Sequence, residues 1–140
     1  MSIVVSRRSG VAVGGTPGTA IRSMAAVMLA VEIAVHAKLA PDHLREIPYI
    51  GAGFVIAAVL LTGVLVAIVV RPDQQLPWLI GALLCVGMAG LFVVSRVTGL
   101  PGFHESWTSD SGLGLVALPP ELIFVLCAWA ALAAGRRSPV

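Results

Sequence analysis

The feature that most constrains this chain is the apolar run from Ile50 to Val70, which contains no charged side chain. A hydrocarbon core about 30 Å thick is crossed by roughly 20 residues of helix. Only a helix of this kind or a closed barrel satisfies its own backbone hydrogen bonds in lipid. The run ends at Arg71, and the following Pro72 cannot continue a helix without losing a hydrogen bond. The sequence therefore predicts a transmembrane helix over 50–70.

The composition extends this interpretation from one segment to most of the chain. Apolar residues make up 58% of the 140 residues and charged residues 11%, with a mean hydropathy of +0.98. Soluble domains carry about a quarter charged residues, and one with so few charges would expose large apolar patches. Nine basic residues against seven acidic ones form no basic stripe, so no nucleic-acid partner is expected. The predicted partner is the lipid bilayer.

Three further segments match the length of a span, which predicts an all-α four-helix transmembrane bundle. The first runs over 21–39 and is expected to stop at Pro41, and the third covers 78–95. The fourth is expected over 119–134, with Pro119-Pro120 in its first turn, where a missing N–H costs little. A kinked or re-entrant start at Leu113 is the alternative. These four spans form one domain over 20–135.

The basic residues predict the orientation, because Lys and Arg concentrate in cytoplasmic segments. Placing both termini in the cytoplasm puts six basic residues inside and three outside, which favours a multi-pass protein of the plasma membrane. Residues 1–19 are then expected to be a disordered cytoplasmic tail, and a cleaved signal peptide is the alternative for this segment. The inner residues are Arg7, Arg8, Arg22, Arg71, Arg136 and Arg137, and the outer ones are Lys38, Arg45 and Arg96.

Glu32 and His36 are the sharpest candidates for function. They lie four residues apart, so a helix places them on one face, one turn from each other. An acid near the middle of a span costs about 2.5–3.5 kcal/mol on insertion scales, so it must face the bundle interior or find a partner. One interpretation is a proton-carrying or ligand-binding carboxylate with His36 beside it. The other is a structural pair that holds helices together.

Arg96 and Glu121 complete the set of candidate binding residues. Arg96 ends the third span, where it is expected to cap the helix carbonyls or to neutralise Glu121 or Glu32. Glu121 follows the double proline, where an acid favours a helix N-terminus through the macrodipole. Both residues fall in the predicted outer half with all three histidines. A function is therefore expected at the outer face.

No pattern in the chain predicts catalysis, a metal or a cofactor. The histidines show neither HxxxH nor HExxH spacing, and only His36 lies within a predicted span, so neither a metal nor haem is expected. Cys85 and Cys127 fall in apolar runs and are interpreted as small apolar side chains. No nucleophile–base pair or phosphate loop is present. The protein is not expected to be an enzyme.

Two stretches resemble a known family. HLREIPYIG over 43–51 and SRVTGLPG over 95–102 are similar to segments of small four-span integral membrane proteins of actinobacteria. The resemblance implies the four-span layout and assigns no catalytic or binding residue. Glu32 also matches the placement of the carboxylate in the first span of small multidrug-resistance transporters. The aromatic residues that line their cation sites are sparse here, and their later glycine motifs have no counterpart.

Three functions remain open from the sequence. The first is a non-enzymatic accessory or structural membrane protein with a polar outer-face cluster. The second is a small proton-coupled transporter or proton relay centred on Glu32, and the third is a redox component that holds a quinone or haem near His36. Small residues at four-residue spacing allow helices to approach closely, within the bundle, in a homodimer or in a larger membrane complex. They are Ala26, Ala30 and Ala34, and Gly81, Cys85 and Ala89.

Overall fold

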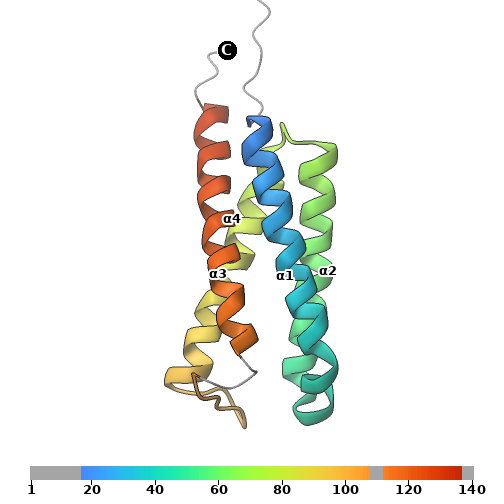
Figure 1. The fold of residues 1–140 in the computed structure, drawn as a ribbon, viewed down its shortest axis with the longest axis vertical. Helices are drawn as coiled ribbons and strands as arrows, with labels where there is room; N and C mark the ends of the chain where they lie inside the picture. The colour runs from blue at the N-terminus through green and yellow to red at the C-terminus, as the bar shows by residue number, and fades with distance from the viewer. Residues whose placement is uncertain (1–16, 108–111, 137–140) are drawn as a thin grey trace, which may run out of the picture.

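A computed structural model of the protein describes residues 17–107 and 112–136. The chain forms the helices α1 (Thr19–Glu46), α2 (Pro48–Val70), α3 (Gln75–Val97) and α4 (Leu113–Arg136), which lie side by side in an antiparallel bundle (Figure 1). All four are long and apolar enough to cross a membrane. The prediction of an all-α bundle of four long apolar helices is confirmed. The predicted tail lies outside the described residues, except at 17–19.

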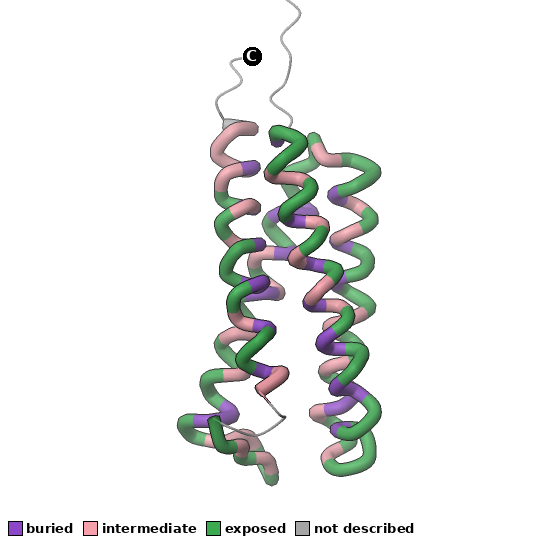
Figure 2. Tube along the Cα trace, viewed as in Figure 1, coloured by how far each residue is buried: buried purple, intermediate pink, exposed green. Residues whose placement is uncertain are grey.

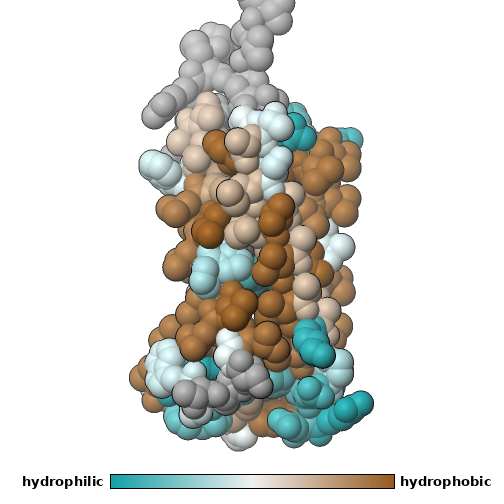
Figure 3. All heavy atoms as spheres, in the orientation of Figure 1, coloured by the Kyte–Doolittle hydropathy of each residue, from teal (hydrophilic) through white to brown (hydrophobic). Residues whose placement is uncertain are grey.

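The bundle has two ends that differ in their connections. At the terminal end, α1 begins, α4 finishes and a short connection joins α2 to α3; at the loop end, α1 turns into α2 and a longer connection joins α3 to α4 (Figure 1). Apolar atoms cover most of the length of the face seen in Figure 3, and hydrophilic residues gather at its loop end. This apolar girdle is what a helix bundle in lipid requires.

Helix α1 is longer than the sequence predicts. Pro41 was expected to end it, and this prediction is wrong, because the helix continues through Pro41 to Glu46. A proline inside a helix removes one backbone hydrogen bond, which packing against neighbouring helices can offset. Leu39 and Ala40 before the proline and His43 after it are all buried, so the same face stays in contact with the bundle.

Helix α4 also starts earlier than the main prediction. It begins at Leu113, the alternative start, and Pro119-Pro120 lie inside it instead of in its first turn. Glu121 therefore sits more than two turns from the helix start, and its interpretation as a residue favoured by the helix N-terminus is wrong. The macrodipole acts within the first turn. Another reason is needed for an acid at this position.

Helices α1 and α2 meet in a tight corner at the loop end. Ile47 alone separates them, and Pro48 opens α2 at a position where its missing N–H costs little. The backbone N–H of Ile47 donates to the His43 carbonyl at 2.8 Å. A Cβ at Gly51 would press against the backbone N and Cα of Leu44. Only glycine lets the two helices approach this closely.

The apolar core of the bundle lies towards the terminal end. Towards the terminal end, large apolar side chains are fully buried, and Trp78 stacks on Phe124 with ring centroids 6.2 Å apart. Gly81 lies against the Phe124 ring, so part of the predicted small-residue row on α3 packs inside the bundle, whereas Ala30 and Ala34 of α1 face outward. Buried positions line the inner faces of the helices in Figure 2. The other residues of this apolar core are Ala25, Leu29, Leu61, Val64, Ile68, Cys85, Ala128 and Ala131.

Helices α2 and α3 are the loosest neighbours. Each helix packs on two others, and the contact between α2 and α3 is the least extensive of the four. The bundle is therefore a ring that is least tightly closed on one side. The weak contact between α2 and α3 leaves space between these two helices.

Candidate functional site

Six buried polar side chains of the described residues gather in the half of the interior that lies towards the loop end. Three helices supply them and α2 supplies none, and each is less than 8% exposed. A buried polar group costs free energy unless it is paired, so this group requires an explanation. Its members are Glu32, His36 and His43 of α1, Ser95 and Arg96 of α3, and Glu121 of α4.

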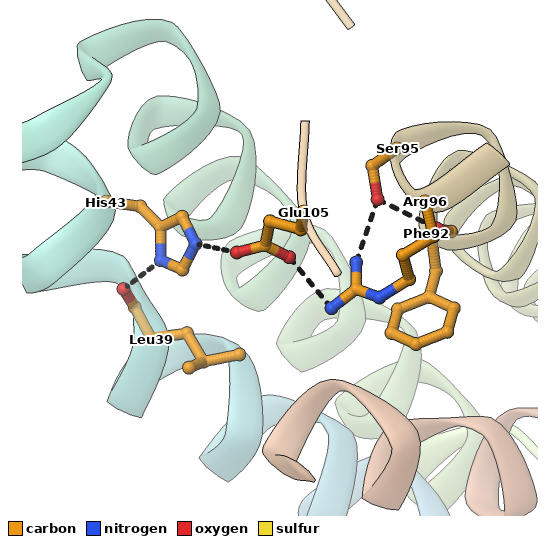
Figure 4. Close-up of polar contacts among 6 residues, drawn as sticks. All are labelled: Leu39, His43, Phe92, Ser95, Arg96 and Glu105. Carbon is orange, nitrogen blue, oxygen red and sulfur yellow. Dashed lines mark hydrogen bonds and ion pairs between the residues drawn. The ribbon is translucent and has the colours of Figure 1, made fainter. Parts of the chain in front are cut away.

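Glu105, in the connection between α3 and α4, joins two of these helices. Its Oε2 lies 2.8 Å from Arg96 Nη2, and its Oε1 lies 3.6 Å from His43 Nε2 (Figure 4). Arg96 Nη1 also donates to Ser95 Oγ at 2.8 Å, and its guanidinium carbon sits 3.8 Å above the Phe92 ring. We call His43, Ser95, Arg96 and Glu105 the loop-end cluster. Through Glu105, this cluster holds the connection between α3 and α4 against α1 and α3.

The backbone of the same connection brings Glu105 into place. Gly99 and Gly102 have φ angles of 78° and 69°, a left-handed conformation that glycine adopts without strain. Leu100 and Phe103, which follow these two glycines, exchange backbone hydrogen bonds of 2.6 and 2.8 Å. The chain therefore reverses and returns towards the end of α3, where the Glu105 N–H donates to the Ser95 carbonyl at 3.3 Å.

The rings of His36 and His43 on α1 are oriented by the same kind of hydrogen bond. His36 Nδ1 donates to the Glu32 carbonyl and His43 Nδ1 to the Leu39 carbonyl, both at 2.9 Å. Because a carbonyl oxygen only accepts, Nδ1 carries the hydrogen in both rings. Both rings also pack against Phe54, at centroid distances of 5.3 and 4.7 Å.

Glu32 and Glu121 form a separate pair of acids in the middle of the bundle. Glu32 is fully buried and Glu121 is 3% exposed, and they lie within electrostatic reach of each other and of Cys85. Among the described residues, neither Glu32 carboxylate oxygen has a hydrogen-bond partner, and neither does Glu121 Oε2. His36 Nδ1 approaches Glu32 Oε2 to 3.6 Å. We call Glu32 and Glu121 the carboxylate pair.

A cavity of about 440 Å³ connects the loop-end cluster with Glu121. Its walls are mostly apolar side chains of α2 and α3, including Phe54 and Met88, and we call it the α2–α3 cavity. Ile56, Leu60 and Leu91 at its rim are 58%, 47% and 57% exposed, so its mouth opens sideways between the two helices. The polar side chains on its wall are His36, Tyr49, Ser95, Arg96, Glu105 and Glu121.

The α2–α3 cavity stops short of the terminal end. None of the fully buried apolar residues Leu29, Leu61, Ile68, Trp78 and Phe124 lines it. These side chains pack the remaining half of the interior. Within residues 17–107 and 112–136, the cavity therefore opens between α2 and α3 and does not extend to the terminal end of the bundle.

The structure brings together most of the residues that the sequence singled out. The prediction that Glu32 and His36 share one face is confirmed by their contact at 3.6 Å. Arg96 pairs with Glu105, which was not among the predicted binding residues, and Glu121 faces the interior. His43 was counted among the outer-half histidines but was not a predicted binding residue, although it lies seven residues after His36 and two helical turns place both on one face. No spacing in the sequence signals Glu105.

Comparisons with known proteins add no relative to this description. No family model matches the sequence, and no match was found among curated proteins or solved structures. Within residues 17–107 and 112–136, no group of three or more His, Cys, Asp and Glu is arranged to hold a metal ion.

Proposed function

We propose that the protein is a non-enzymatic accessory protein of the plasma membrane that binds a small amphipathic molecule in the α2–α3 cavity. The observation that carries the proposal is the division of this cavity into apolar walls and a polar side with a buried, unpartnered Glu121 oxygen. Ligand sites are mostly apolar clefts of about 300–1,000 Å³ with a few placed polar groups. The cavity of about 440 Å³ falls in this range.

The sideways mouth supports entry from the membrane. A molecule with an apolar tail already lies among the lipid chains that surround α2 and α3, so it can slide between the helices without crossing water. With both termini in the cytoplasm, as the basic residues favour, the loop end faces outward. The polar group of the ligand would then lie at the level of the outer leaflet, near His36 and Glu121.

A photoreactive alcohol tests this proposal with one cavity-filling variant and one matched control. Gly53 lines the cavity, and a Cβ at this position meets nothing within 4 Å, so Gly53→Leu can fill the space without a backbone clash. Gly63 on the same helix is equally open and does not line the cavity, which makes Gly63→Leu the control. The probe is decanol with an alkyl diazirine, used in lipid nanodiscs.

The labelled residues decide the result. Val35 and Leu39 of α1 are 9% and 7% exposed and line the cavity, so a probe reaches them only from inside it. We expect labelling of both residues in the wild type and in Gly63→Leu, and its loss in Gly53→Leu. Labelling that is confined to lipid-facing residues, or unchanged in Gly53→Leu, would contradict the proposal.

A proton relay centred on Glu32 is the second candidate, and the absence of a hydrogen bond to its buried carboxylate among the described residues favours it. An ionisable residue within a membrane span is a functional candidate by default. Glu32→Gln preserves the shape of the side chain and should abolish any proton movement that the protein supports in vesicles with an internal pH dye. Unchanged proton movement in that variant would sink this candidate. The third possibility, a redox component, falls within the main proposal when the ligand is a quinone.

A further inference from the structure

Acidic side chains outnumber basic ones around the α2–α3 cavity. Arg96 is engaged by Glu105 at 2.8 Å, so the positive charge closest to the cavity has its own carboxylate. The carboxylate pair lies deeper, and α2 contributes no ionisable side chain between Tyr49 and Arg71. The titratable groups of the described residues that face this region are Glu32, His36, Tyr49, Cys85, Arg96, Glu105 and Glu121.

Glu121 is the member of the pair that a ligand can reach. It lines the cavity, is 3% exposed, and its Oε2 has no hydrogen-bond partner among the described residues. Glu32 is fully buried, does not line the cavity and lies within electrostatic reach of Glu121. His36 Nδ1 is committed to the Glu32 carbonyl at 2.9 Å. An unpaired buried acceptor of this kind favours a ligand that donates a hydrogen bond or carries a positive charge.

We infer that the amphipathic ligand is a cation with an ammonium headgroup, bound by Glu121 with the charge of Glu32 within electrostatic reach. This inference rests on the proposed function and adds the charge of the ligand. An ammonium group donates three hydrogen bonds, and its charge compensates acids that have no other cation committed to them. The Phe54 ring on the cavity wall offers a further attractive surface for a cation. The apolar tail lies along α2 and α3.

Binding of the cation displaces a proton. Two ionised carboxylates in lipid without a cation repel each other and lose their hydration, so the empty pair holds a proton. When the ammonium group arrives, the O–H bond of the carboxyl breaks and the proton leaves through the cavity to water. The new carboxylate then pairs with the ammonium nitrogen. One cation enters and one proton leaves, so the charge of the site is unchanged.

Three probes with the same tail test the charge of the ligand. Decylammonium is a cation, decanol is neutral and decanoate is an anion. Their binding to the protein in nanodiscs is measured by calorimetry, with the heat of binding to protein-free nanodiscs subtracted. Repeating the titrations in buffers of different ionisation enthalpy gives the number of protons released. We expect decylammonium to bind at least about tenfold more tightly than decanol, because bonds to charged groups contribute more than neutral ones.

Glu121→Gln is the diagnostic variant, because it keeps the size of the side chain and removes its charge. It should lower the affinity for decylammonium about tenfold or more and abolish proton release, while decanol binding changes less than about twofold. Asp42→Asn is the matched control, since the Asp42 side chain is 75% exposed at the loop end and away from the cavity wall. This control should bind all three probes as the wild type does.

The pH dependence in the wild type provides a second measurement that needs no variant. Because the proton competes with the cation, the affinity for decylammonium should rise with pH, by up to about tenfold per unit while the proton is held. An affinity that is flat with pH, or a preference for decanol or decanoate, would overturn the inference and leave the proposed function intact. If no probe binds, or if Gly53→Leu does not affect binding, the proposed function fails as well.

Discussion

The corner between α1 and α2 gives the sharpest prediction for stability. Gly51→Ala adds one methyl group at a position where it would press against the backbone N and Cα of Leu44. A side chain could rotate away from such a clash, but a backbone cannot, so the helices must separate. Overpacking costs typically about 1–3 kcal/mol, and a clash with backbone belongs at the upper end of this range. We expect Gly51→Ala to lose about 3 kcal/mol of unfolding free energy.

Gly53→Ala is the matched control, two residues further along the same helix. A Cβ at Gly53 meets nothing within 4 Å, so this change adds only the preference of alanine for a helix, up to about 1 kcal/mol of stabilisation. The two variants should therefore differ by about 3–4 kcal/mol, which is more than about a hundredfold in the folding equilibrium constant. Reversible unfolding in mixed micelles with increasing dodecyl sulfate, followed by tryptophan fluorescence, measures the difference. Equal midpoints would refute the close approach of α1 and α2.

Three further predictions concern the loop-end cluster, the apolar core and the orientation. Glu105→Gln should lose about 2–3 kcal/mol in the same assay, because buried Arg96 and His43 share this carboxylate, and a loss as small as that of exposed Asp42→Asn would contradict a stabilising role for the cluster. Phe124→Ala should lose about 3–5 kcal/mol of unfolding free energy by opening a cavity beside Trp78. Leu126→Ala, at a position that is 65% exposed, should change the stability little. Similar losses in both variants would show that the Trp78–Phe124 stack does not stabilise the core. A fluorescent protein fused to the C-terminus should fluoresce and alkaline phosphatase fused there should be inactive, and the opposite pattern would place this terminus outside.

The number of spans could be predicted because each span is encoded locally. A run such as 50–70 has no alternative in lipid to a helix that satisfies its own hydrogen bonds. The contact between Glu32 and His36 could also be predicted, because helical spacing alone brings residues four apart together. Both predictions required no knowledge of how the helices pack.

The helix ends and the partners of the buried charges could not be predicted in the same way. Pro41 does not end α1, because packing of the residues on both sides of it outweighs one lost hydrogen bond. Glu105 reaches Arg96 only because the connection reverses at Gly99 and Gly102. The α2–α3 cavity depends on the loose contact between two helices, which no local pattern records. Each of these features is tertiary in origin.

The most direct test of the central claim, that the α2–α3 cavity holds an amphipathic molecule, is native mass spectrometry of protein extracted in a mild detergent. Wild type, Gly53→Leu and Gly63→Leu are purified side by side from the same host. The account predicts a co-purifying mass on the wild type and on Gly63→Leu, and its absence from Gly53→Leu. A bare wild-type protein, or the same bound mass on all three, would contradict it.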